Sequence, residues 1–184
     1  GVVPEPQLWN NCGPATLSMN LSFFNWGKTQ VEAAAILKPN ERDKNVMPYE
    51  MVNFVNEQTS LRALSRMGGD LETIKRLLNA GFPVLVEKGF EPANLKKEGW
   101  MGHFNLVVGY NDETRSFTTH DSYLLSHPPG GGEITNKANF PGFTVTYDDM
   151  ISNWRAFNFV FLVVYPSDQE NDVLNALGPL MYEE

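Results

Sequence analysis

Apolar side chains recur at helical spacing through the first half of the sequence, and helix start signals precede several of these segments. Pro14 suits a first helical turn, because its missing N–H would have no intrahelical partner there. Thr29 and Glu32 have the spacing of a capping box, and Asp70 is a candidate N-cap. The pattern therefore predicts helices over residues 12–26, 29–37 and 71–80, and a further helix opened by Pro48.

The second half changes to short apolar runs with the composition of β-strands. Residues 111–114 form a turn signal between two runs and predict a β-hairpin, while Asp148 is a candidate cap for a short helix through Trp154. Two long loops, 89–102 and 122–142, can wall a functional site, although the Gly-rich second loop equally fits a disordered surface segment. The predicted strands are 83–87, 104–110, 115–120, 143–147 and 157–165. Helices followed by an antiparallel sheet define an α+β fold.

A chain of 184 residues is long enough for one domain with a substantial core. We expect this domain to cover residues 1–166, followed by an acidic tail, 167–184, that can be helical and either packs on the domain or leads to a further one. The net charge of −8 makes nucleic acid and anionic membrane surfaces poor partners. No apolar run approaches the ~20 residues of a membrane span. The start at Gly1 fits either a processed product or an expressed fragment whose targeting segment is gone.

The single cysteine of the chain, Cys12, stands at the start of the first predicted helix. The positive end of a helix dipole favours a thiolate, so this is a suitable place for a nucleophile. A lone cysteine is more often a small buried hydrophobe, but the neighbours here are polar asparagines and a glycine. One cysteine also excludes an intrachain disulfide and leaves the redox compartment open.

Three histidines, His103, His120 and His127, could serve this thiol as a base. Imidazole titrates near neutrality, so it can take a proton from a thiol and return it to a leaving amine. His103 directly precedes the predicted strand 104–110, where a rigid strand end meets a loop. A single histidine at a strand edge more often has a structural role. The strand that pairs with 104–110 favours a catalytic role for His103.

A regular hairpin about the 111–114 turn pairs residues whose numbers sum to about 225, which brings His103 close to Asp121 or Ser122. A carboxylate there can fix the imidazole tautomer and stabilise the imidazolium. Adjacent residues of a strand point to opposite faces, so His120 cannot share a site with Asp121. No metal-ligand spacing links these residues with the cysteine, which argues against a zinc site.

Groups that could contact a substrate lie close to these residues in the sequence. Gln7 can offer its side-chain N–H to the oxyanion of acyl transfer, and the backbone N–H of Cys12 can offer a second donor. Trp9, Trp100 and Tyr123 lie on predicted loops and could line an apolar cleft for an extended, uncharged peptide.

Together these residues resemble the papain-like cysteine peptidases, and most closely the bacterial branch related to the double-glycine, bacteriocin-processing peptidases. The matching segments, in the family's order, are Gln7, Asn11-Cys-Gly-Pro-Ala15, Gly102-His-Phe-Asn-Leu-Val-Val-Gly-Tyr-Asn-Asp112 and His120-Asp-Ser-Tyr123. The resemblance implies a papain-like fold without cofactor or metal. It also implies four site residues: the nucleophile Cys12, the general base His103, the orienter of that base, Asp121, and the oxyanion donor Gln7.

The sequence departs from the bacteriocin processors in ways that concern the substrate. These enzymes are fused to an export transporter and often have Asp before the cysteine, whereas this chain has Asn11 and no membrane segment. Double-glycine specificity is therefore not carried over. Relatives that resemble this chain are commonly extracytoplasmic, which implies an extracytoplasmic or secreted protein. Some carry helical repeats after the peptidase domain, and residues 168–184 would be the junction to such a further domain if there is one.

The leading hypothesis is a cysteine peptidase that hydrolyses peptide bonds through a thioester acyl-enzyme. A catalytically silent peptide-binding or scaffold domain of the same fold is the second hypothesis, and an acyltransferase is the third. All four candidate residues are present, which argues against a silent domain, whereas hydrolysis and transfer use the same residues. The expected partner is a peptide or protein, and the charge of −8 disfavours acidic peptides.

Overall fold

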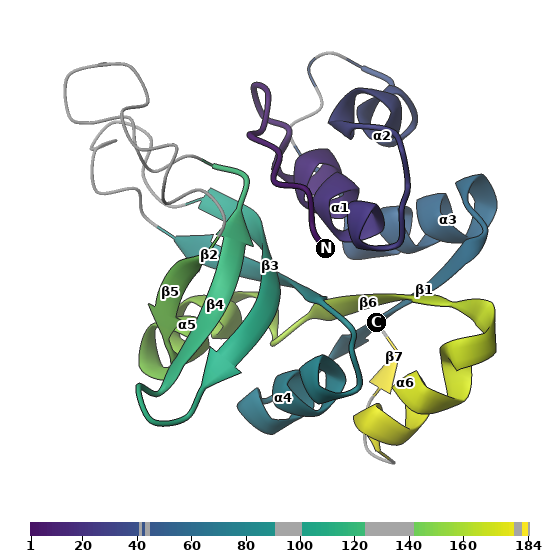
Figure 1. The fold of residues 1–184 in the computed structure, drawn as a ribbon. Helices are drawn as coiled ribbons and strands as arrows, with labels where there is room; N and C mark the ends of the chain where they lie inside the picture. Colours follow the sequence, from purple (N-terminus) through teal and green to yellow (C-terminus); the bar gives the residue numbers. More distant parts are fainter. Residues whose placement is uncertain (41, 43–44, 91–100, 124–141, 179–181, 184) are drawn as a thin grey trace, which may run out of the picture.

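The computed structural model of the protein describes residues 1–40, 42, 45–90, 101–123, 142–178 and 182–183. These residues form helices packed on an antiparallel sheet, an α+β fold (Figure 1). The helices are α1 (Cys12–Phe23), α2 (Gln30–Leu37), α3 (Pro48–Gln58), α4 (Leu71–Asn79), α5 (Tyr147–Trp154) and α6 (Glu170–Leu177), with 3-10 turns η2 (Arg155–Phe157) and η3 (Ser167–Gln169). The strands are β1 (Leu61–Met67), β2 (Val84–Phe90), β3 (Met101–Asn111), β4 (Ser116–Asp121), β5 (Phe143–Thr146), β6 (Phe161–Pro166) and β7 (Tyr182–Glu183).

The strands form one sheet, with the order β5-β4-β3-β2-β6-β1-β7 across the described part of the chain. Neighbouring strands in this order are antiparallel. Strands β3 and β4 make the predicted hairpin, and β2 pairs with the other side of β3. The hairpin and β2 therefore lie side by side, and Figure 1 shows them next to the helical group of α1, α2 and α3.

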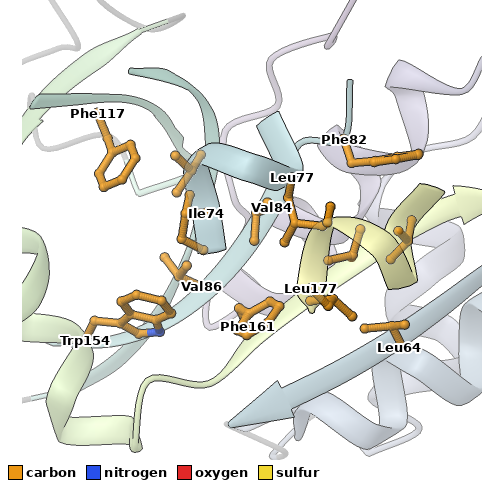
Figure 2. Close-up of a cluster of buried hydrophobic side chains, with 14 of the residues drawn as sticks. Leu64, Ile74, Leu77, Phe82, Val84, Val86, Phe117, Trp154, Phe161 and Leu177 are labelled. Atoms are coloured by element: carbon orange, nitrogen blue, oxygen red, sulfur yellow. The ribbon is translucent and has the colours of Figure 1, made fainter. Parts of the chain in front are cut away.

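Both faces of the sheet are covered by apolar residues from helices. One cluster packs between the sheet and α4, α5 and α6, with Trp154 and Phe161 among its largest members (Figure 2). The second cluster packs between the sheet and α1, α2 and α3. Along β2, Val84 and Val86 belong to the first cluster and Leu85 to the second. Strands buried on both faces need continuous apolar runs, which is why this strand lacks an apolar–polar alternation.

Helix α1 is the most deeply placed helix around the candidate cysteine. Its residues 13–21 are all buried, and it contacts α2, α3, β2 and β3. Gly13 permits a close approach of α3, since a Cβ at this position would lie 2.9 Å from the Cε atom of Met51. A close-packed helix has little freedom to shift, so its burial fixes the position of its first residue, Cys12, relative to the sheet.

The helix predictions are confirmed, with small differences at the ends. Thr29 and Glu32 form the capping box of α2, and α3 begins at Pro48. The Asp70 side chain accepts a hydrogen bond from the first turn of α4, as expected for an N-cap. Helix α1 ends at Phe23, three residues earlier than predicted.

Three local predictions are wrong. Residues 61–67 form strand β1, although their sequence lacks an apolar–polar alternation and was assigned to the helical half. Strand β6 begins at Phe161, because Asn158 and Phe159 have φ angles of 51° and 56°, which interrupt an extended chain. The cap of α5 is Thr146, whose hydroxyl accepts a backbone N–H, and Asp148 lies instead in the first helical turn.

The segment predicted as an acidic tail forms η3 and α6 before β7. Val173, Ala176 and Leu177 of α6 belong to the first apolar cluster. Arg76 of α4 donates to the carbonyl oxygens of Ala176 and Leu177, at 2.7 Å and 3.3 Å. Helix α6 therefore packs on the rest of the protein, while the domain boundary at residue 166 stays a prediction.

Candidate active site

Cys12 is the first residue of α1, and its side chain is partly exposed at the end of an otherwise buried helix. The preceding residue, Asn11, is at the N-cap position but makes no side-chain capping hydrogen bond. Its amide nitrogen donates instead to Oε1 of Gln30, at 2.8 Å. The start of α1 therefore presents the positive end of the helix dipole at Cys12, where negative charge is stabilised.

His103 on β3 and Asp121 on β4 are joined by a short hydrogen bond. His103 Nε2 lies 2.6 Å from Asp121 Oδ1, and the side chains are 2% and 6% exposed. Asp121 pairs with Asn105 in the ladder, and Asn105 is two residues beyond His103, so these three side chains share one face of the sheet. The bond occupies Nε2, which leaves Nδ1 of the imidazole for its interaction with the Cys12 thiol.

The charges of this pair stabilise one another. Burial by itself lowers the pKa of His103, but the charge and hydrogen bond of Asp121 and the contact with Cys12 outweigh it and raise this pKa to about 9. Burial likewise raises the pKa of Asp121, but His103, Lys88 and a backbone N–H bond outweigh that effect, so the carboxyl pKa lies below its ordinary value. At neutral pH this arrangement favours an imidazolium next to a carboxylate.

Both carboxylate oxygens of Asp121 have further partners. Lys88 Nζ on β2 lies 3.7 Å from Oδ2, and the backbone N–H of Tyr123 donates to Oδ1 at 2.9 Å. With its amide nitrogen turned toward Asp121, Asn105 donates to Oδ2 at 2.9 Å, and its amide oxygen accepts from Lys88 Nζ at 3.0 Å. Sequence reasoning missed Lys88 and Asn105, although the period of two along β3 places Asn105 on the same face as His103.

Gln7 is held next to the start of α1 through Ser122. Its backbone N–H donates to the carbonyl oxygen of Ser122 at 2.9 Å, and the Ser122 hydroxyl donates to Gln7 Oε1 at 3.1 Å. The same hydroxyl lies 3.4 Å from Thr16 Oγ1, one helical turn beyond Cys12. Since the Gln7 side-chain oxygen is engaged, its amide nitrogen is the atom that can donate to an anion.

Gln30, the first residue of α2, fixes the segment that carries Gln7. Gln30 is only 3% exposed. Its side-chain oxygen accepts from the backbone N–H of Leu8 at 2.7 Å and from the amide nitrogen of Asn11. Its amide nitrogen donates to Glu5 Oε1 at 3.0 Å and to the Pro6 carbonyl oxygen at 2.7 Å. This residue was also missed, because a glutamine after a capping threonine is typical of an exposed first turn.

His120 is separated from the His103–Asp121 pair. It pairs with Leu106 of the second apolar cluster, so its side chain lies on the other face of the sheet. Burial lowers the pKa of His120. The third histidine, His127, lies outside the described residues. Within the described ranges, no three His, Cys, Asp or Glu side chains are grouped so that they could hold a metal ion.

Two of the three aromatic residues predicted to line a cleft are described. Trp9 is 74% exposed on the segment between Gln7 and Cys12. The ring of Tyr123 lies edge-on to the imidazole of His103, with centroids 6.0 Å apart. The third, Trp100, lies outside the described residues. Trp9 and Tyr123 therefore come from the two segments that flank the candidate catalytic groups.

A family model described as the Peptidase_C39 like family matches residues 1–159. The chain belongs to this family. The resemblance to the bacteriocin-processing peptidases inferred from the sequence is thereby confirmed. No curated protein matches the sequence.

Solved structures share the fold of this C39-like chain. A protein from Bacillus anthracis described as C39-like has a TM-score of 0.63 and 14% identity, over 89% of this chain and 94% of that chain. The peptidase domain of Streptococcus ComA, a bifunctional ABC transporter of a quorum-sensing pathway, has a TM-score of 0.62 and 13% identity, over 89% and 97%. A double-glycine-motif protease from an AMS/PCAT transporter, in complex with the leader peptide, has a TM-score of 0.60 and 15% identity, over 91% and 93%.

The fold is therefore the papain-like fold of C39 peptidases, as predicted. Two of these similar structures come from transporters. In the part of this chain that the structure describes, no helix has the length and apolar character needed to cross a bilayer.

Proposed function

We propose that this protein is a cysteine peptidase whose nucleophile is Cys12 and whose acid and base is His103. Asp121 orients the imidazole, and Gln7 donates to the oxyanion. The observation that carries the proposal is the 2.6 Å hydrogen bond between the buried His103 and Asp121 side chains, formed by an imidazole that also interacts with the only thiol. Membership of the C39-like family and the papain-like fold support the same reaction class.

The reaction begins with a proton on the imidazole and a thiolate on Cys12. The thiolate attacks the carbonyl carbon of a peptide bond, and the oxyanion accepts hydrogen bonds from the Gln7 amide and the Cys12 backbone N–H. The imidazolium of His103 gives its proton to the leaving amine as the C–N bond breaks, which leaves a thioester. The neutral imidazole then takes a proton from water as the water oxygen attacks the thioester. Cleavage of the C–S bond releases the carboxylate product and returns the thiolate.

The proposed substrate is a peptide or protein without a double-glycine requirement. Asn11 occupies the position where bacteriocin processors often have Asp, and it is only 5% exposed. Its side chain is engaged by Gln30 at 2.8 Å and by Lys38 Nζ at 3.5 Å. Both polar atoms of the Asn11 side chain therefore have partners inside the protein, and these contacts hold the start of α1 in place.

A peptide library digested in ¹⁸O-labelled water tests the proposal. Hydrolysis should give products with one labelled oxygen in each new C-terminal carboxylate, and Cys12→Ala should give none. His103→Ala should also abolish cleavage, whereas His120→Gln should cleave normally because His120 lies on the other face of the sheet. Unlabelled products joined to an added amine would indicate acyl transfer. Equal cleavage by the parent and Cys12→Ala would refute the proposed nucleophile.

A further inference from the structure

A lysine lies at the back of the His103–Asp121 pair. Lys88 on β2 is directly opposite His103 in the ladder, so their side chains share a face of the sheet. The Lys88 side chain is only 12% exposed, and its Nζ atom lies 3.7 Å from Asp121 Oδ2. The Asp121 carboxylate therefore has a cationic partner at each oxygen: His103 at Oδ1 and Lys88 at Oδ2.

Asn105 connects the lysine to the carboxylate. With its amide nitrogen turned toward Asp121, Asn105 donates to Oδ2 at 2.9 Å and its oxygen accepts from Lys88 Nζ at 3.0 Å. These contacts come from three adjacent strands and occupy the carboxylate oxygen that faces away from the imidazole. A carboxylate held in this way cannot rotate to exchange its oxygens without breaking buried polar contacts, which are costly to lose.

We propose that Lys88 is a positioning residue of the active site, which holds the Asp121 carboxylate and limits how strongly that carboxylate retains the proton on His103. This inference rests on the proposed peptidase function. A general acid has to release its proton, and an imidazole bound to a buried, uncompensated carboxylate would release it too reluctantly. A fixed ammonium on the far oxygen shares the negative charge and so keeps the imidazolium acidic enough to protonate a leaving amine.

The titratable groups around Asp121 in the described ranges come from four places. They are His103 on β3, Lys88 on β2, Cys12 at the start of α1, and Tyr123 just beyond β4, whose ring lies edge-on to the imidazole. Removal of a fixed cation makes proton loss harder at every neighbouring group, so the direction is the same for all of them. Lys88→Met should therefore move the whole pH profile of the site upward.

Alkylation of the full chain by iodoacetamide tests this inference without a substrate, because Cys12 is the only cysteine. The rate is measured against pH for the parent, Lys88→Met, Lys88→Gln and Lys88→Arg. The profile should have two transitions: the onset of thiolate reactivity and the loss of the imidazolium proton. Both should move up by about 1 pH unit in Lys88→Met and Lys88→Gln. Lys88→Arg keeps the charge and should retain the parent profile.

Lys75→Met is the matched control. The Lys75 side chain is also 12% exposed and pairs with Asp112 at 2.6 Å. Lys75, however, lies on α4, and Asp112 lies at the turn end of the hairpin, away from the proposed site. Its substitution should leave the alkylation profile unchanged. Because Lys88→Gln can keep polar contacts with Asp121 and Asn105, it keeps the test available if Lys88→Met does not fold.

The outcomes separate this inference from the proposed function. If Lys88 were merely structural, its loss would disorder the pair, and the two transitions would converge toward an ordinary thiol near ~8.5 and an ordinary imidazole near ~6.5. Convergence, or an unchanged profile, would overturn the role of Lys88. A parent profile that is already that of an ordinary isolated thiol would instead refute the proposed peptidase site.

Discussion

Replacement of Asp121 by asparagine tests the central pair of the site, because it keeps the side-chain shape and removes the charge. Burial alone would lower the pKa of His103, and the Asp121 carboxylate is the main influence that instead raises it from 6.5 to about 9. In Asp121→Asn, burial would act on the imidazolium without this carboxylate. We therefore expect the pKa of His103 to fall to its ordinary value or below it.

The raised pKa also predicts how stability depends on pH. The folded protein binds the imidazole proton more tightly than the unfolded chain, in which the pKa is the ordinary 6.5. The resulting stabilisation is complete below pH 6.5 and is lost as the pH rises to about 9. At about 1.4 kcal/mol for each pH unit, the free energy of unfolding should fall by roughly 3 kcal/mol over this window. Asp121→Asn should lack this fall, although it should be less stable at every pH because Lys88 loses its partner.

Urea unfolding followed by tryptophan fluorescence between about pH 6 and 10 measures this difference. Both proteins should carry Cys12→Ala, so that the thiol does not titrate in the same range. Cys12 also contributes to the raised pKa of His103, so the fall in this background should be smaller than roughly 3 kcal/mol but still present with Asp121 and absent with asparagine. Asp112→Asn, which removes the partner of Lys75 at the other end of the hairpin, is the control and should keep the fall of the parent. An equal pH dependence in the parent and Asp121→Asn would show that the imidazole does not owe its proton affinity to this carboxylate.

Three further substitutions address the segment before α1. Gln7→Ala should lower turnover roughly 100- to 1000-fold by removal of an oxyanion donor. It should leave Cys12 alkylation nearly unchanged, and unchanged turnover would assign the donor role elsewhere. Gln30→Leu should lower the free energy of unfolding by roughly 2–4 kcal/mol in urea titrations, because several polar groups lose a buried partner; a smaller loss would mean that water replaces the side chain. Trp9→Ala should change stability by less than about 0.5 kcal/mol, since the side chain is 74% exposed, but should raise KM for cleaved peptides. An unaltered KM would exclude Trp9 from substrate contact.

The proximity of His103 and Asp121 was predictable because a short turn joins their strands. The predicted sum of about 225 would place Asp121 opposite Phe104, on the wrong face, whereas the structure pairs Asp121 with Asn105. The ladder changes register between Val107 and Gly109, where β3 has a bulge. A shift of one residue exchanges the two faces of a strand, so the bulge decides that Asp121 points to the same side as His103.

Other parts of the site depend on contacts that leave little signal in a sequence. Lys88 and His103 pair in the sheet but are separated by 14 residues in the sequence, too far for their register to be counted from a turn signal. Gln30 acts through bonds to a segment more than 20 residues earlier in the chain. Strand β1 was missed for a different reason, because Ser65 and Arg66 follow the adjacent apolar residues Ala63 and Leu64, so its sequence lacks the regular alternation that identifies a strand.

The proposed site is a row of charges that alternate in sign across four elements: Lys88, Asp121, His103 and Cys12. Each inner group has an opposite charge on both sides, so the penalty for burial of a charge is offset locally and does not depend on the net charge of the protein. Loss of an inner group breaks the short bond and leaves a buried charge without its partner, which should lower stability at every pH and, for Asp121, also abolish the raised pKa of His103. Loss of the outer lysine removes one of the contacts that hold the carboxylate but leaves the short bond and the Tyr123 contact in place, so it should appear mainly in the pH profile. The row therefore predicts a large loss of stability in Asp121→Asn and mainly a shifted pH profile in Lys88→Met. Four independently placed residues would not give this difference between the two variants.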